Sequence, residues 1–511
     1  MSIDIEQTPL FSTSLQPLLS LARQSELFQG LSSLLHWDQE TQMPPKAATL
    51  RSEQLELLAS LRHRHLSGGA YRKALGQLID LESGEMRAEG LDELSSTCLR
   101  RLWKDWDREV KLPDRFVKRW ARLTSEALEV WKKARSSAQF ALFAPWLAKI
   151  VEMSQKRAQL LGYHKEPYDA LLDLYEEGME TEQLALLFDP VKKSLPDLCR
   201  LPAAGALALL PGRFPQEQQL ASARDLLKAM GYDFSAGQLS LSTHPFCSAA
   251  HPTDCRLTLR TKEENCLEVY SVALHEGGHA LYEMQLPEAA FGTPLGQASS
   301  MGVHESQSRF WEVYLGGSLP FSHYLCRSLR THFPAQLASL SPEELYQRVN
   351  QVSPSCIRVE ADEVTYPLHV ILRFEIERKL IDGTLSVEQL PAHWNEQMEQ
   401  LLGITPRNDA EGCLQDIHWS MGAFGYFPTY LLGNIYAAQL WDRFRSESVG
   451  WEERVAKGDL LFIKSWLGQK IHRHGRRYLP RELIEKATGQ PLSTASYLSY
   501  LQTKYGPSAG R

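Results

Sequence analysis

The chain has 511 residues and a mass of 58.0 kDa, enough for one large helical enzyme or for about three average domains. Its hydrophobic content of 43% and charged content of 23% are ordinary for a soluble globular protein. The net charge of −7 and the isoelectric point near 6.2 argue against a nucleic-acid-binding protein, which would normally carry a basic face.

Membrane and secretory segments are not expected. The longest apolar run, residues 201–210, is Ala-rich and much shorter than the ~20 residues that span a bilayer. The N-terminus is acidic where a signal peptide would be basic, and the eight cysteines are scattered without a Cys-x-x-Cys pair. The sequence therefore predicts a cytoplasmic protein with reduced thiols and with neither a membrane nor a nucleic-acid partner.

The first third of the chain is predicted to be helical. Leucines at helical spacing indicate a helix over residues 14–35, which Pro44 and Pro45 would end. The polar cluster around Trp37 is interpreted as a packed corner with paired polar groups. Residues 51–163 are helical in pattern, with breaks expected at Pro113 and Pro145.

The middle of the chain changes in texture. A helix is predicted from Pro167 to a glycine at Gly178, and residues 201–215 are the most linker-like stretch. Residues 237–262 are rich in β-formers that alternate, so we expect a small sheet there. Its edge strand could bind a substrate backbone by strand addition, or the strands could form a plain structural hairpin.

Residues 268–283 contain the pattern His-Glu-x-x-His at His275, Glu276 and His279. On a helix, residues four apart lie on one face, so both imidazoles point at one spot, as two ligands of a tetrahedral zinc do. Glu276 lies beside that spot, where it can take a proton from an attacking water. Gly277 and Gly278 each cost ~1 kcal/mol of helix stability, which indicates that another backbone or a substrate comes close. A core helix with two surface histidines is the alternative.

A zinc site needs a third protein ligand. The metzincin pattern requires Gly at 282 and His at 285, where the chain has Tyr282 and Gln285. The remaining candidates are Glu283, Glu288, Glu305 and Glu312. Glu283 continues the face of the two histidines and suits a supporting role, whereas Glu305 lies on a separate predicted helix over residues 302–312. Spacing favours Glu305 and leaves the others open.

The last third combines two polar and aromatic stretches with further helices. Residues 355–367 and 412–430 lack a clear period, which is typical of loops that form sites. Helices are predicted over residues 431–505. The sequence shows no internal repeat, so we expect one large helical body over residues 1–511, either undivided or in two lobes.

Six motifs, in this order, resemble those of the M32 family of metallocarboxypeptidases, the thermostable carboxypeptidase type within the gluzincin class. They are His244-Pro-Phe, Asp254-x-Arg256-x-Thr258, the pattern at His275, His304-Glu-Ser, Ile357-Arg-x-x-Ala-Asp362 and Gly412-x-x-Gln-Asp-x-His-Trp419. The resemblance extends from the Trp37 region to the final helices. Six ordered motifs are far more specific than the zinc pattern alone.

The resemblance implies a mainly α-helical, saddle-like fold of the neurolysin type, with a deep groove and a small β-sheet near the active site. It implies Zn²⁺ held by His275, His279 and Glu305, with Co²⁺ able to replace it. It also implies a homodimer. The implied activity is the removal of single amino acids from peptide C-termini, with broad side-chain tolerance and with Glu276 as general base and acid.

Oxyanion stabilisation and recognition of the terminal carboxylate each require further side chains. The oxyanion needs donors besides the metal, and by analogy with related gluzincins His418 and Tyr426 are the candidates, with Tyr430 second for the tyrosine. Simple packing is the alternative for these aromatic side chains.

A terminal carboxylate is best recognised by the bidentate fork of an arginine. Arg358 is the first choice and Arg256 the second, and His244 is the remaining predicted substrate-binding residue. The alternative for Arg358 is a structural salt bridge to Asp362.

Two other functions compete with a zinc carboxypeptidase. A zinc oligopeptide endopeptidase would carry the same metal residues, and only Arg358 and the resemblance argue against it. A silent scaffold that binds peptides would be expected to have lost part of the metal set, which is intact.

Overall fold

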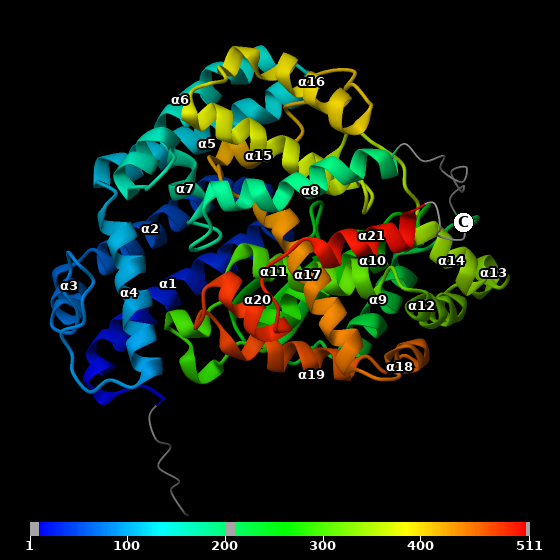
Figure 1. Cartoon of the computed structure of the whole chain (residues 1–511), viewed down its shortest axis with the longest axis horizontal. Coiled ribbons are helices and arrows are strands. Elements are labelled where there is room, and N and C mark those ends of the chain that lie inside the picture. The colour runs from blue at the N-terminus through cyan, green and yellow to red at the C-terminus, as the bar shows by residue number, and fades with distance from the viewer. Residues whose placement is uncertain (1–9, 200–209, 507–511) are drawn as a thin grey trace, which may run out of the picture.

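The computed structural model describes residues 10–199 and 210–506. The protein is mainly helical, with one small sheet, as the sequence predicts. Figure 1 shows the N-terminal helices along one side, with one tier of helices above and a second tier below. The N-terminal helices are α1 (Gln16–Thr41), α2 (Ala48–Leu66), α3 (Gly69–Gly76) and α4 (Glu93–Val110).

The upper tier combines two separate parts of the chain (Figure 1). Its helices are α5 (Asp114–Ser136), α6 (Phe140–Leu161), α7 (Pro167–Leu172), α8 (Thr181–Cys199), α15 (Tyr366–Asp382) and α16 (Leu390–Leu402). Helix α15 is the centre of this tier, because it packs against α6, α7, α8 and α16. Most of its residues are buried, which explains why it shows almost no polar face.

The lower tier contains the helices that surround the His-Glu-x-x-His segment. They are α9 (Gln216–Met230), α10 (Cys266–Met284), α11 (Met301–Arg309), α12 (Leu319–His332), α13 (Pro334–Leu337), α14 (Pro342–Val349), α17 (Pro428–Glu447), α18 (Trp451–Lys457), α19 (Leu461–Lys470), α20 (Pro480–Thr488) and α21 (Ala495–Tyr505). Helix α17 lies along α11 and also contacts α15, so it joins the two tiers.

The predicted small sheet is confirmed. It consists of β1 (Gly237–Leu241), β2 (Cys247–His251) and β3 (Asp254–Leu259), in the order β1-β3-β2. Strands β2 and β3 form the expected antiparallel hairpin, whereas β1 pairs in parallel with β3. Strand β2 is therefore an edge strand, and it lies between α10 and α1.

Helix α1 runs past the predicted corner at Trp37, so that prediction was wrong. The prolines that stop the helix come only after its C-cap at Gln42. Trp37 is buried against Phe246, with ring centroids 5.6 Å apart, and Asp38 pairs with Arg51 at 2.5 Å. The expected pairing of polar groups therefore holds, but inside a helix.

Two other boundaries also differ from prediction. Pro145 does not break α6, because it lies just beyond the first turn and the burial of Phe143 and Leu147 beside it offsets the lost hydrogen bond. Helix α7 ends at Leu172, and turns carry the chain from there to Gly178. The linker predicted at 201–215 lies largely outside the described residues. The break at Pro113 and the helices after residue 431 are confirmed.

The buried apolar side chains form two clusters. The larger cluster contains buried side chains from between Phe116 and Tyr505 in sequence, and it lies between the helices of both tiers. The smaller holds the N-terminal helices together, and Ala290 and Leu295 of a later loop complete it. Among the described helices, none has the length and apolar character required to cross a membrane.

Candidate metal centre

Helices α10 and α11 lie so close that only a glycine fits between them. A Cβ on Gly278 would lie 2.6 Å from the carbonyl oxygen of Gln307 and 2.8 Å from the Cα of Ser308. A Cβ on Gly277 would instead meet the side-chain ends of Leu227 and Met230 on α9, both at 2.8 Å. The close backbone approach predicted from the two glycines is confirmed, and it sets the distance between the two helices.

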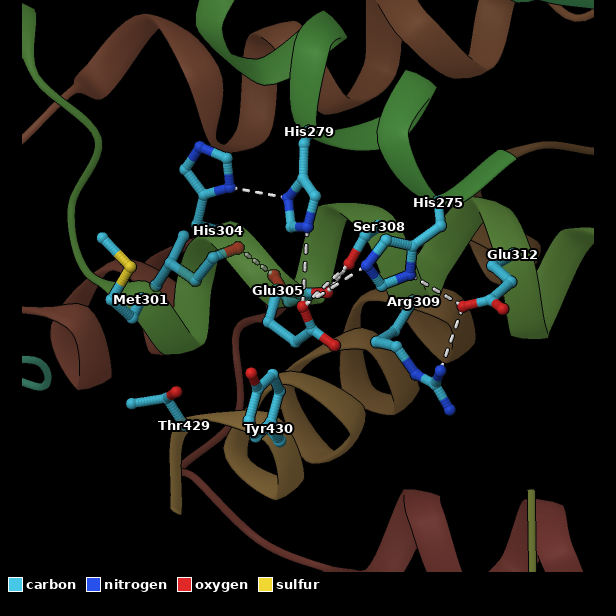
Figure 2. Close-up of polar contacts among 12 residues, drawn as sticks. His275, His279, Met301, His304, Glu305, Ser308, Arg309, Glu312, Thr429 and Tyr430 are labelled. Atoms are coloured by element: carbon cyan, nitrogen blue, oxygen red, sulfur yellow. Dashed lines mark hydrogen bonds and ion pairs between the residues drawn. The ribbon is translucent and has the colours of Figure 1, made fainter. Parts of the chain in front are cut away.

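Three side chains converge across this contact (Figure 2). The Nε2 atoms of His275 and His279 lie 3.9 Å and 3.6 Å from Oε2 of Glu305, and one donor atom from each residue falls within 4.8 Å of the others. Two imidazoles and one carboxylate at this spacing fit a zinc ion with a fourth position left open. Among the described residues, this is the group of histidine and carboxylate side chains that could hold a metal ion.

His275 is oriented from behind by Glu312. Its Nδ1 lies 2.9 Å from Oε2 of Glu312. The Glu312 carboxylate also accepts hydrogen bonds from Ser271 at 2.7 Å and from Arg309 at 3.0 Å. Burial raises the pKa of the Glu312 carboxyl, but the charges of Arg309 and His275 bring it down to about 2. An ionised carboxylate on Nδ1 fixes the tautomer that leaves Nε2 free to bind a metal.

His279 is oriented through a second histidine. Its Nδ1 lies 2.6 Å from Nδ1 of His304, whose Nε2 lies 2.8 Å from Oε1 of Glu283. Proton donation from His279 to His304, and from His304 to Glu283, gives a hydrogen-bond partner to Nδ1 of His279 and to both ring nitrogens of His304. The Nε2 atom of His279 again remains directed at Glu305.

These contacts distinguish the roles of the four glutamates that the sequence offered as candidates for the third metal ligand. Glu312 contacts Nδ1 of His275 directly, and Glu283 supports His279 only through His304. Glu288 lies in a short 3₁₀ turn, Glu288–Ala290. Glu305 alone among the four joins the group, and the hydroxyl of Ser308 donates to its Oε2 at 3.2 Å.

Charge at this spot favours a cation. Burial lowers the pKa of His275, but the negative charges of Glu305 and Glu312 outweigh it and raise that pKa to about 9. Glu276 lies beside the two histidines and is 7% exposed. Burial, together with Glu305 and Glu312, raises the pKa of Glu276 to about 7 against the opposing charge of His275. A carboxyl with a pKa in this range can both accept and release a proton near neutral pH.

The predicted oxyanion residues form one aromatic wall near Glu305. Nε2 of His418 lies 3.1 Å from the hydroxyl of Tyr430, and the Tyr426 ring packs on Tyr430 at 5.3 Å. The hydroxyl of Tyr426 points to the sulfur of Met301, at 4.0 Å. Figure 2 shows Tyr430 on α17, below Glu305. The hydrogen-bonded partner of His418 is therefore Tyr430, which the sequence ranked behind Tyr426.

Arg358 is buried and paired, although not with the residue expected. Its Nε and NH2 lie 3.0 Å and 2.8 Å from Oδ1 of Asp416, and its NH1 donates to the hydroxyl of Tyr366 at 3.1 Å. The alternative of a salt bridge to Asp362 was wrong, because Asp362 instead accepts hydrogen bonds from Val364 and Thr365 in the turn that precedes α15. The guanidinium lies 4.8 Å from the ring centre of Tyr430, which places it behind the aromatic wall.

The other two predicted substrate-binding residues make their contacts outside this group. Arg256 forms two hydrogen bonds with Asp254 of its own strand and lies 5.9 Å from the Trp37 ring. His244 is exposed in the turn between β1 and β2. No hydrogen bond or ion pair among the described residues joins either one to His275, His279 or Glu305.

Sequence reasoning missed the residues behind the site. His304 and Arg373 have no spacing rule that predicts their contacts, because each acts across two helices or a helix and a loop. Arg309 and Glu312 are three residues apart, a spacing that favours an ion pair on a helix. For His304, the only signal was its position directly before Glu305 in the His-Glu-Ser motif.

Comparisons with known proteins cover nearly the whole chain. The family model for the Carboxypeptidase Taq (M32) metallopeptidases matches residues 17–505. Thermostable carboxypeptidase 1 of Thermus thermophilus is 38% identical over 505 residues, covering 96% of this chain and 98% of the relative. Carboxypeptidase 1 of Bacillus subtilis is 35% identical over 477 residues, covering 93% and 94%. The crystal structure of an M32 carboxypeptidase from Deinococcus radiodurans R1 superposes with a TM-score of 0.93 at 37% identity, covering 98% of this chain and 100% of that one.

Proposed function

This chain belongs to the M32 family of metallocarboxypeptidases, and from that premise we propose that it holds Zn²⁺ through His275, His279 and Glu305 and uses Glu276 as general base and acid. It is a hydrolase of the carboxypeptidase class, so the endopeptidase and silent-scaffold alternatives lose their support. The observation that carries the proposal is the convergence of three donors with both histidine Nδ1 atoms already held by partners.

A zinc ion held there would polarise the scissile carbonyl and lower the pKa of a water molecule. Glu276 lies next to His275 on α10, so its carboxylate takes the proton of the attacking water and then delivers it to the leaving amine.

We propose Tyr430, held by His418, as the donor to the oxyanion. The hydrogen bond of 3.1 Å makes the two side chains one unit, and burial lowers the pKa of His418 to about 3, so its ring is neutral. Burial also raises the pKa of the Tyr430 hydroxyl well above its ordinary value, so it keeps its proton and can donate it. Tyr426, the first candidate from sequence, packs beside this pair and remains the alternative.

We propose Arg358 as the group that recognises the terminal carboxylate. Arg358 and Arg373 both bind Asp416, so these three buried groups carry one positive charge in excess. A substrate carboxylate would balance that charge. The approach would pass Tyr430 and Tyr366, the rings that lie against the Arg358 guanidinium.

The test compares inhibition by an N-acylated dipeptide with a free carboxylate and by its C-terminal amide. In the wild type, the acid should bind more tightly by about 10- to 100-fold, as expected for a hydrogen bond to a charged group worth ~1.5–3 kcal/mol. Arg358→Lys should remove most of this preference. Arg373→Lys is the matched control, because it disturbs the same aspartate and should keep the preference. Equal preferences in wild type and Arg358→Lys would reject the assignment.

Further properties rest on the family resemblance and on composition. We propose that Co²⁺ can replace Zn²⁺, that residues 1–511 form a single catalytic domain, that two copies form a homodimer, and that the protein works in the cytoplasm on peptides of varied C-terminal residue. Analytical ultracentrifugation of the purified chain tests the dimer, which a single species near 58 kDa would contradict.

A further inference from the structure

A fully buried carboxylate holds the loop that carries His418, which belongs to the proposed oxyanion pair, and Tyr426, the alternative donor. We name residues 418–427 the His418 loop. It begins with a short 3₁₀ turn, His418–Met421, and leads to the start of α17. His418 begins the loop and Tyr426 lies near its end. Glu377, on the buried helix α15, is 0% exposed and takes no part in the metal centre or the aromatic wall.

Glu377 accepts three hydrogen bonds, two of them from this loop. The indole Nε1 of Trp419 donates to Oε1 at 2.9 Å, and the backbone N–H of Gly425 donates to Oε2 at 3.0 Å. The hydroxyl of Tyr168 on α7 also donates to Oε2, at 2.6 Å. All three partners are donors, so the acceptor they require is a carboxylate.

The two loop contacts flank the catalytic candidates in sequence. Trp419 directly follows His418, and Gly425 directly precedes Tyr426. Gly425 has φ of +93°, and a Cβ there would lie 2.6 Å from the backbone carbonyl of Leu171 on α7. Trp419 is 3% exposed and packs on Phe424 and Trp394. The loop is therefore pressed against α7 at one end and fixed by its indole at the other, and Glu377 joins both ends.

We propose that Glu377 is a positioning residue, which fixes the His418 loop so that the His418 and Tyr430 pair and the Tyr426 ring face the metal centre. This inference rests on the proposed function of those side chains. A buried carboxylate is unfavourable unless its partners satisfy it, and an apolar side chain would fill the same space without that cost. What the carboxylate adds here is a fixed distance between the two ends of the loop.

The main variant is Glu377→Gln, which keeps the volume but replaces one acceptor oxygen by an N–H donor. At least one of the three donors then loses its acceptor. The matched control is Tyr168→Phe, which removes one hydrogen bond to the same carboxylate and leaves both loop contacts, from Trp419 and Gly425, in place. Trp419→Phe is a second test variant, since it releases one end of the loop and leaves Glu377 in place. His418→Ala measures how much activity depends on His418 itself.

Four quantities are measured on each zinc-loaded protein: bound zinc per chain, kcat and KM for one substrate peptide, and hydrogen exchange of the segment that covers residues 418–427. Glu377→Gln should bind zinc as the wild type does, exchange this segment faster, and lose about 10- to 100-fold in kcat, as a displacement near 1 Å commonly produces. Tyr168→Phe should keep wild-type exchange in the segment and a kcat within about 3-fold, because both loop contacts remain.

The outcomes separate this inference from the proposed function. Wild-type exchange and kcat in Glu377→Gln, with a large loss in His418→Ala, would overturn the role of Glu377 alone. A wild-type kcat in His418→Ala would overturn the proposed role of His418, and exchange would then still decide whether Glu377 holds the loop. Where Glu377→Gln does not fold, Trp419→Phe decides in its place: wild-type exchange and kcat in that variant would overturn the inference.

Discussion

Gly278 is the position where a single methyl group tests how the metal centre is built. In Gly278→Ala, the new Cβ would lie 2.6 Å from the Gln307 carbonyl oxygen and 2.8 Å from the Ser308 Cα, both of which are backbone atoms. Favourable contacts begin near ~3.5 Å, so α11 must move away from α10 by up to about 0.9 Å. Glu305 moves with α11, whereas His275 and His279 stay on α10.

Two opposing effects set the change in folding stability, and the narrow tolerance of metal–ligand distances sets the change in zinc affinity. Overpacking costs ~1–3 kcal/mol, and replacing glycine by alanine in a helix returns ~1 kcal/mol, so the net loss of folding stability is about 0–2 kcal/mol. Metal–ligand distances tolerate only ~0.2 Å, so a larger helix displacement should weaken zinc binding at least ~10-fold.

The assay is the dissociation constant of zinc, measured by competition with a coloured chelator, together with the thermal midpoint of the zinc-free protein. Gly277→Ala is the matched control. Its Cβ meets only the flexible ends of Leu227 and Met230, which can turn aside, so zinc binding should match the wild type. If Gly278→Ala binds zinc as tightly as Gly277→Ala, the spacing between α10 and α11 does not set the site.

Of three further predictions, two concern the site, and the third concerns Glu176, a fully buried carboxyl group that accepts hydrogen bonds from the backbone N–H of Gly302 at 3.1 Å and from the Tyr436 hydroxyl at 2.7 Å. Glu312→Gln should weaken zinc binding about 10- to 100-fold while the fold stays intact, because the amide supports Nδ1 of His275 less strongly than a carboxylate; an unchanged zinc dissociation constant would refute this. Tyr430→Phe should lose ~10²–10³-fold in kcat and Tyr426→Phe much less, and the reverse order would return the oxyanion role to Tyr426. Burial raises the pKa of Glu176 to about 7 from an ordinary value of 4.5, so native Glu176 binds its proton more tightly than the unfolded chain does, and the folding stability of the wild type falls as pH rises between these values. Relative to the wild type, Glu176→Gln should therefore gain up to about 3 kcal/mol of stability between pH 4.5 and pH 7.5. Urea unfolding that gives the same stability difference between the two proteins at both pH values would contradict this prediction.

The sequence predicts the parts of this site that depend on local spacing. His275, Glu276 and His279 follow from the helical repeat alone, and the double glycine beside them indicates the close approach of another backbone. The small sheet and most helices likewise follow from periodicity and turn residues. The helix boundary near Trp37 was missed because the stop signals, Pro44 and Pro45, come only after it, whereas at Pro145 tertiary burial outweighs the local stop signal.

Contacts between distant segments could not be predicted in the same way. The pairing of Arg358 with Asp416 spans 58 residues, and that of Glu377 with Trp419 spans 42. Asp362 was the nearer acid in sequence, yet its oxygens already accept hydrogen bonds from Thr365 in the turn before α15. A charged residue chooses its partner by the packing of the fold, and a single sequence carries no record of that choice.

The most direct test of the central claim measures bound zinc and turnover on the same preparations of three proteins. We predict one zinc per chain in the wild type and in Glu276→Gln, with stepwise loss of single C-terminal residues from an N-terminally blocked peptide by the wild type only. Glu305→Ala should lose both zinc and activity. A Glu276→Gln protein that still removes C-terminal residues at the wild-type rate, or a Glu305→Ala protein that keeps its zinc, would contradict the account.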